Sequence, residues 1–141
     1  MKNTIFIVLF LTLFSSVFAQ TDETIKVGIF ADMTGQTASF GVSTLSGIKM
    51  AADEINAKGG INGRKIELIL EDNQGLPENT KTVVQKLIKE KKVHALLGEV
   101  LSTNSLAAAP IAQAAKIPMI SPSSTNPRVT KVGDYIFRTC F

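Results

Sequence analysis

Two patterns of apolar and polar positions alternate along the chain. Five short apolar runs have the length and the β-branched content of buried strands, at 24–30, 65–72, 93–98, 117–121 and 134–141. Three longer segments carry apolar residues at helical spacing, at 41–60, 77–92 and 102–116. Gly59 and Gly60 should end the first helix, and Pro110 should kink or interrupt the third.

This alternation of strands and helices predicts an α/β fold. Parallel strands need long crossover connections, and helices of this length supply them. Right-handed crossovers place helices on both faces of such a sheet. We therefore expect one domain built on a doubly wound, mostly parallel sheet with helices on both faces. The strand order is left open by the pattern.

The first 19 residues have a different character. Lys2 precedes an apolar run at 5–14, and Val17 and Ala19 occupy the positions that a signal peptidase recognises. The run is short for a membrane span, and no cysteine directly follows it as a lipid anchor would need. A buried helix or a membrane anchor is the alternative. The order of charge, apolar run and cleavage site favours a signal peptide at 1–19, and hence a mature chain at 20–141 in the periplasm or outside the cell.

Charge and cysteine content narrow the possible partners. The 141 residues carry a formal net charge of +3, which includes Lys2 of the signal segment. So mild a charge argues against nucleic acid and against an anionic membrane surface as partners. Cys140 is the single cysteine, so no intrachain disulfide is possible, and we expect it to be a small core residue. The apolar end "YIFRTCF" suggests a piece of a longer protein.

Candidate chemistry lies in the loops that follow the strands. In doubly wound sheets ligands bind beyond the carboxyl ends of the strands, where helix N-termini offer unpaired N–H groups. Two of these loops, "GEVLSTNS" (98–105) and "SPSSTNP" (121–127), are rich in hydroxyl groups. Ser102 or Thr103 should cap the third helix, and Ser121 and Ser124 are interpreted as turn residues. Two such loops at one edge, with Phe40 near them in the loop 31–41, favour a small polar ligand.

No set of residues points to catalysis or to a metal. The single histidine, His94, lies in a predicted apolar strand and is interpreted as structural. Phosphate-binding glycine motifs are absent, no serine has an evident base, and no cluster has metal-ligand spacing. Glu71 and Asp72 are adjacent on a strand and should point to opposite faces, so they are interpreted as loop polar groups or helix-capping acids. We expect a binding protein rather than an enzyme, with no cofactor.

Three stretches resemble a known family. They are "IKVGIFADMTGQTASFG", "GIKMAADEINAKGGINGRKIELILEDNQ" and "STNSLAAAPIAQAAKIPMISPSSTNP", of which "DEINAKGGINGRKIEL" (53–68) is the most specific. The chain resembles, from about Ile25 to Phe141, the N-terminal lobe of the leucine/isoleucine/valine-binding proteins. These are substrate-binding components of ABC importers with two lobes and a ligand cleft between them. The resemblance implies that 20–141 is the N-terminal ligand-binding lobe and that the second lobe is missing.

The resemblance also implies roles for four residues. Ser102 matches the serine whose hydroxyl and N–H hold the carboxylate of an amino-acid ligand. Ser123 matches a position that uses its backbone, and Thr125 matches a threonine whose hydroxyl and N–H grip the head of the amino acid. Phe40 matches an aromatic residue, often tyrosine, that packs near the ligand. Some relatives have a disulfide at positions that match Gly75 and Leu101, and both partners are missing here.

These correspondences lead to a functional expectation. The protein should be a monomeric periplasmic solute-binding component that captures an amino acid, branched-chain or similarly apolar, for the membrane permease of an ABC importer. An extracellular ligand-sensing domain of a receptor is the alternative role. An amide or urea is the alternative ligand. A cleavable signal without another apolar span favours transport over sensing.

Overall fold

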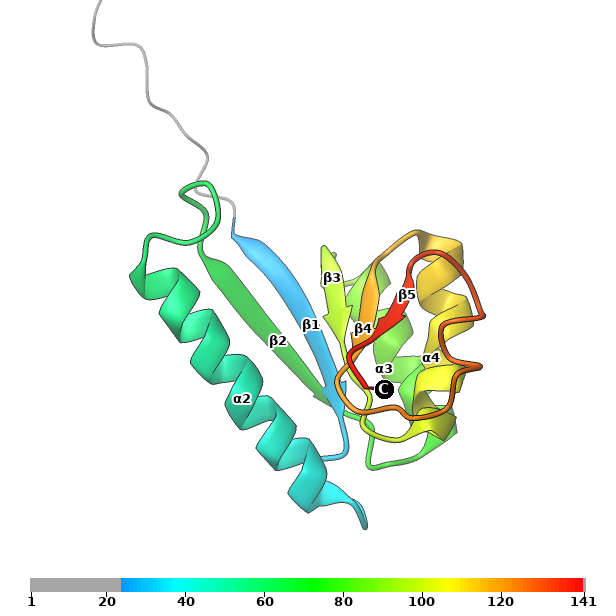
Figure 1. The fold of residues 1–141 in the computed structure, drawn as a ribbon. Helices are drawn as coiled ribbons and strands as arrows, with labels where there is room; N and C mark the ends of the chain where they lie inside the picture. Colours follow the sequence, from blue (N-terminus) through cyan, green and yellow to red (C-terminus); the bar gives the residue numbers. More distant parts are fainter. Residues whose placement is uncertain (1–23, 141) are drawn as a thin grey trace, which may run out of the picture.

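The computed structural model describes residues 24–140, so the predicted signal peptide at 1–19 lies outside the described residues. Strands and helices alternate through this range, as expected (Figure 1). The elements are β1 (Ile25–Ala31), α2 (Ala38–Ala57), β2 (Ile66–Asp72), α3 (Pro77–Lys89), β3 (Ala95–Leu97), α4 (Ser102–Ala115), β4 (Met119–Ser121) and β5 (Ile136–Arg138). All three helices and all five strands that the pattern predicts are present.

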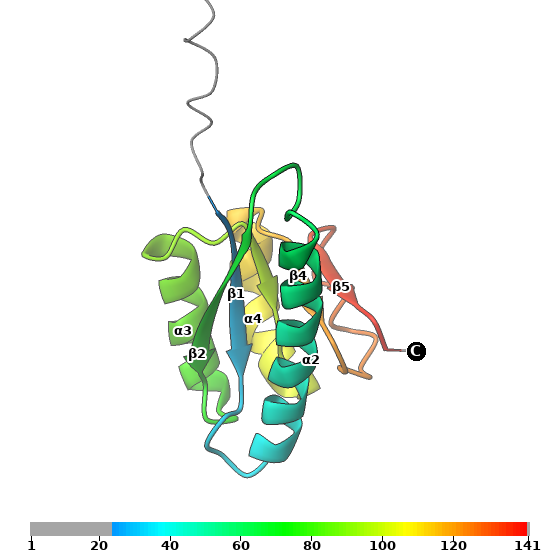
Figure 2. The ribbon, with the colours of Figure 1, turned by 90° about the vertical axis from the view of Figure 1, so that its left-hand side faces the viewer.

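The strands form one parallel sheet in the order β2-β1-β3-β4-β5. Helix α2 packs against β1 and β2 on one face, and α3 and α4 pack together on the other. Figure 2 shows β1 and β2 between α2 on one side and α3 on the other. The predicted doubly wound sheet with helices on both faces is therefore confirmed.

The main hydrophobic core lies between the sheet and the pair α3–α4. Strand residues that point to this side are almost completely buried; they are Phe30, Leu96, Met119 and Ile136. Leu87 of α3 and Ala108 of α4 meet them from the helices, and neither is exposed. The small side chains of α4 let this helix pack closely on α3 and on the sheet.

The opposite face is covered over only part of its width. A row of apolar residues crosses it in register, because Ile29 pairs with Leu97, Leu97 with Ile120, and Ile120 with Phe137. Ile29, close to α2, is 1% exposed, but Ile120 is 37% and Phe137 49% exposed. No helix of residues 24–140 lies over β4 and β5 on this side (Figure 1). We call the surface of Leu97, Ile120 and Phe137 the open face.

Helix α2 begins and ends three residues earlier than expected. It starts at Ala38, so Phe40 lies in the helix and not in the preceding loop. The start is set by Asp32, whose carboxylate accepts hydrogen bonds from the N–H of Gly35 and from the N–H and hydroxyl of Thr37. At the other end, the N–H of Gly59 donates to Asn56 and that of Gly60 to Ile55, which is the Schellman pattern of a helix end.

Other predicted boundaries are also corrected. Pro110 lies inside the continuous helix α4 and does not interrupt it. Leu101, in an extended conformation, precedes this helix, so neither Ser102 nor Thr103 is its cap. Helix α3 stops at Lys89, and Lys92 has a φ of 57°, which no α-helix contains. Strands β3, β4 and β5 are three residues each, shorter than the apolar runs that contain them.

Candidate functional site

A buried carboxylate lies where the loops after β1 and β3 meet. Glu99 follows β3 and has no exposed surface. Its Oε1 accepts a hydrogen bond from the N–H of Asp32 at 3.0 Å, and its Oε2 accepts one from the N–H of Leu101 at 2.7 Å. The side-chain amide of Asn104, in the first turn of α4, donates to Oε2 at 3.3 Å. Glu99 thus connects the end of β1 to the start of α4.

The main-chain carbonyl of the same residue binds the loop after β4. Hydroxyl groups of Ser121, Ser105 and Ser124 lie 2.7, 3.1 and 3.2 Å from the Glu99 carbonyl oxygen. The Ser124 hydroxyl is also 2.8 Å from that of Ser105, and the N–H of Ser124 donates to Ser121 Oγ at 3.0 Å. Ser121 and Ser124 are buried, so they anchor the loop as well as form its turn.

Three of the four predicted site residues come together at this edge. Ser102 is the first residue of α4, and its hydroxyl accepts the N–H of Asn126 at 3.2 Å. The Ser123 hydroxyl donates to the Val100 carbonyl at 3.3 Å. Thr125 directly precedes Asn126, whose N–H reaches Ser102. Phe40 is 61% exposed on the first turn of α2 and takes no part in the hydrogen bonds that hold the loop after β4 to Val100 and Ser102.

Several hydrogen-bond donors at this edge have no acceptor within residues 24–140. Thr125 is exposed, and its N–H and hydroxyl make no hydrogen bond within residues 24–140. Its carbonyl is held by Arg138, whose Nη1 donates at 2.9 Å. At the start of α4 the N–H groups of Ser102 and Thr103 also have no acceptor in this range. Such donors at a helix N-terminus favour an anion, in particular a carboxylate.

Burial and hydrogen bonds shift two carboxyl groups in opposite directions. Burial raises the pKa of Glu99 above its ordinary value, although the donors from Leu101, Asp32 and Asn104 oppose the shift. For Asp72, partial burial is outweighed by donors, chiefly the Thr34 hydroxyl at 2.6 Å and the N–H of Met33 at 3.0 Å, so its pKa is lowered.

The two acids at the end of β2 have structural partners. Asp72 binds the loop after β1, whereas Glu71 forms an ion pair with Lys86 of α3 at 2.8 Å. These neighbours therefore point to different faces, as predicted. The expected structural role of His94 is also seen, because its Nδ1 accepts the N–H of Lys26 at 3.0 Å. Cys140 is half-buried rather than part of the core.

Sequence reasoning missed Glu99 and Asp32. Asp32 directly follows β1, and Glu99 lies two residues beyond the end of β3, which is the only local signal. Their partners are distant in sequence, since the N–H of Asp32 reaches Glu99 across 67 positions. Spacing along the chain therefore gave no indication that these two acids organise the edge of the sheet.

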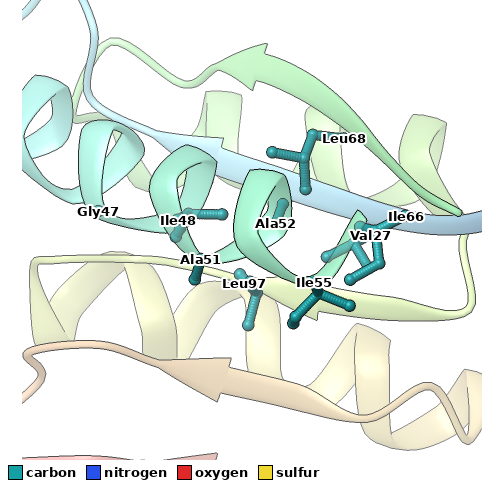
Figure 3. A pocket seen from close by; sticks show the side chains of 9 residues that line it. All are labelled: Val27, Gly47, Ile48, Ala51, Ala52, Ile55, Ile66, Leu68 and Leu97. Atoms are coloured by element: carbon teal, nitrogen blue, oxygen red, sulfur yellow. The ribbon is translucent and has the colours of Figure 1, made fainter. Parts of the chain in front are cut away.

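Two cavities differ in chemistry. One, of about 320 Å³, opens at the carboxyl edge among the loops after β1, β2 and β3, and Gly75, Leu101 and Asp32 are among the residues that line it. The other, of about 290 Å³, lies between α2 and the sheet. Figure 3 shows that glycine and aliphatic residues line the second cavity, including Ile48, Ile55 and Leu97. The second cavity therefore lacks polar side chains for an amino-acid head group.

Other kinds of site find no support in the described range. Among residues 24–140 no group of three His, Cys, Asp or Glu side chains could hold a metal ion. The helices of this part of the chain are too short or too polar to cross a membrane.

Comparison with known proteins identifies the family. A model of the family described as "Periplasmic binding protein" matches residues 24–141. The chain belongs to this family, which consists of binding proteins rather than enzymes. Within it, the chain groups with the branched-chain amino acid-binding proteins.

Individual relatives agree with this assignment. An "Amino acid binding protein" of Pseudomonas aeruginosa is 38% identical over 117 residues, which cover 82% of this chain and 31% of the relative. The substrate-binding protein of a branched-chain amino acid transporter from Streptococcus pneumoniae, solved with isoleucine, is 38% identical with a TM-score of 0.82, over 84% of this chain and 34% of that one.

A third relative binds a different ligand. A solute-binding protein from Rhodopseudomonas palustris, solved with 3,4-dihydroxybenzoic acid, is 39% identical with a TM-score of 0.75, over 82% of this chain and 31% of that one. The chain spans about a third of the length of the relatives it matches.

Proposed function

We propose that the full-length protein is the periplasmic solute-binding component of an ABC importer and that it captures an amino acid, branched-chain or similarly apolar. The observation that carries the proposal is the set of unpaired donors at the carboxyl edge, from Thr125 and from the start of α4. The ligands named for the relatives support it, because isoleucine and 3,4-dihydroxybenzoic acid share a carboxylate.

Each group at the edge has a role in holding the zwitterion. The N–H groups at the start of α4 bind the ligand carboxylate, and the Ser102 hydroxyl, which accepts from Asn126, keeps its own proton to donate. The N–H and hydroxyl of Thr125 bind the same head group. The Ser123 carbonyl faces the ammonium, and Phe40 packs near the ligand. The second lobe closes over the first, and a membrane permease receives the ligand.

Selectivity should differ between the two ends of the ligand. A buried donor left without a partner costs about 1–3 kcal/mol, so loss of the carboxylate should be heavily penalised. A methylene more or less in the side chain changes binding by about 1–3 kcal/mol, which gives softer discrimination among apolar amino acids.

Calorimetry on the full-length gene product tests the proposal. The panel contains leucine, isoleucine, valine and 3,4-dihydroxybenzoate, and leucinamide is the matched control without a carboxylate. We expect at least one branched-chain amino acid to bind and leucinamide to bind far more weakly. The proposal is wrong if no amino acid binds.

A further inference from the structure

Glu99 is a buried carboxylate to which the proposed ligand contacts give no role. Burial of an ionised carboxyl group is costly unless several donors compensate it. N–H donors from Asp32, Leu101 and Asn104 converge on its two oxygens. A buried carboxylate that needs several donors, at the junction of the ligand loops, indicates a role in organising these loops.

The hydrogen-bonding atoms of this junction can be accounted for completely. Ser121 and Ser105 donate their protons to the two lone pairs of the Glu99 carbonyl. The Ser124 hydroxyl then donates to Ser105 Oγ, which also accepts the N–H of Glu99 at 3.2 Å. Within residues 24–140 every buried side-chain nitrogen or oxygen has a partner. Removal of one of these groups therefore takes a hydrogen-bond partner from another member of the network.

We propose that Glu99 is the positioning residue of the ligand loops, an inference that rests on the proposed function. Its carboxylate fixes the start of α4, where Ser102 offers its N–H, and its carbonyl fixes the loop that presents Thr125. The distance between the two sets of donors is thereby set before a ligand arrives. Preorganisation of this kind strengthens binding because no loop has to be ordered on association.

The carboxylate chemistry is essential to this role. The donors that face the Glu99 carboxylate are all N–H groups, from the backbones of Asp32 and Leu101 and from the side-chain amide of Asn104. The side-chain amide of Asn73, after β2, adds a further hydrogen bond to it. Both carboxylate oxygens must therefore accept. Glu99→Gln keeps the size of the side chain but turns one acceptor into a donor. An N–H group then faces another N–H, at Asp32 or at Leu101, and one of the two loops is released.

Calorimetry on the full-length protein with leucine and isoleucine separates positioning from mere stability. For Glu99→Gln we expect the Kd to rise about tenfold or more, with an unchanged binding stoichiometry, because the folded molecules all bind but bind weakly. A purely structural role would lower the stoichiometry and leave the Kd unchanged, and that result would overturn the proposal.

A matched control is available at the opposite edge of the sheet. The Asn56 side chain donates to the Ile66 carbonyl at 2.9 Å and accepts the Ile66 N–H at 2.7 Å. Asn56→Asp replaces an amide by a carboxyl group, which is the reverse of the change in Glu99→Gln. It also removes the hydrogen bond to the Ile66 carbonyl. We expect it to lower stability and leave the Kd unchanged. An equal rise in Kd for both variants would contradict a specific role of Glu99.

Hydrogen exchange tests the inference without a ligand. In Glu99→Gln the amides of Asp32 and Leu101 should exchange faster than in the wild type, while that of Ile66 should not change. If leucine and isoleucine do not bind the wild type, the proposed function loses its support, and the exchange rates alone decide on Glu99. Ser124→Ala serves if Glu99→Gln does not fold, and it should raise the Kd in the same direction. Unchanged exchange at Asp32 and Leu101 would refute the positioning role.

Discussion

Neighbouring hydroxyl groups in the loop after β4 have opposite environments. Ser121 and Ser124 are buried, and their hydroxyl groups donate to the Glu99 carbonyl and to Ser105. Thr125, one position further on, is exposed, and its hydroxyl is unused within the described range. A hydroxyl-rich loop is therefore needed for two reasons, to hold the loop in place and to present donors to a ligand.

Thr125→Ala tests the donor role at the residue scale. We expect ligand affinity to fall about tenfold or more, because a charged ligand group loses a hydrogen bond in a closed site. The melting temperature should not change, since this hydroxyl supports no other group. Thr130→Ala is the matched control, because that hydroxyl already donates to the Pro127 carbonyl. Equal affinity of Thr125→Ala and wild type would remove Thr125 from the site.

Asp72 gives the protein a pH-dependent contribution to stability. Its pKa is lowered in the folded state, so the contribution is present above its ordinary value of 3.8 and is lost as the pH falls through the folded-state pKa. Asp72→Asn should therefore show a smaller loss of unfolding free energy on acidification, measured by urea unfolding at several pH values. If Asp72→Asn and the wild type lose the same free energy of unfolding on acidification, this role of Asp72 is wrong.

For Glu99 the contribution to stability changes with pH in the opposite direction. Its raised pKa makes a contribution that is present below the ordinary value of 4.5 and is lost as the pH rises through the folded-state pKa. Glu99→Gln does not titrate, so this loss should disappear in the variant.

At the scale of elements, α2 is positioned by a close backbone contact. A Cβ at Gly41 would lie 1.9 Å from the carbonyl oxygen of Asp32, whereas a Cβ at Gly47 would meet nothing within 4 Å. The first turn of α2 thus packs directly on the end of β1, and Asp32 holds it there through Gly35 and Thr37.

The two glycines of α2 therefore predict opposite effects of one substitution. Gly41→Ala should destabilise the fold by about 1–3 kcal/mol, because the backbone that it meets has no room to move. Gly47→Ala should stabilise it by up to about 1 kcal/mol through helix propensity. Chemical unfolding measures the free energy of unfolding of the two variants. A Gly41→Ala variant as stable as the wild type would refute the close contact with Asp32.

The elements themselves were predictable, and their junctions were not. The apolar pattern located β1 because both faces of this strand are covered at its end, and it located α3 because this helix buries one side. The start of α2 was placed too late because Thr37 donates to Asp32 instead of capping the helix, and no local pattern signals that use. The site residues followed from resemblance, whereas Glu99, whose partners come from four separate segments, required the structure.

At the scale of the molecule, the two faces of the sheet are unequal. The side of α3 and α4 holds a closed core, while Ile120 and Phe137 remain partly exposed on the open face. Contiguous apolar surface of this kind promotes association or dye binding in water.

The isolated chain 20–141 should therefore bind an apolar fluorescent dye. We expect Phe137→Ser to reduce the fluorescence, because Phe137 is the most exposed residue of the open face. Met50→Ser is the matched control, since Met50 is 65% exposed on α2 but lies outside that row. Equal fluorescence of Phe137→Ser and the unsubstituted chain would show that the dye binds elsewhere.

The strand order has a consequence for how the chain is made. β2 adds to one side of β1, β3 to its other side, and β4 and β5 each add to the strand before them in the sequence. Every new strand thus finds its neighbour already synthesised. A chain that emerges with its N-terminus first can extend this sheet outward step by step, without waiting for a later strand.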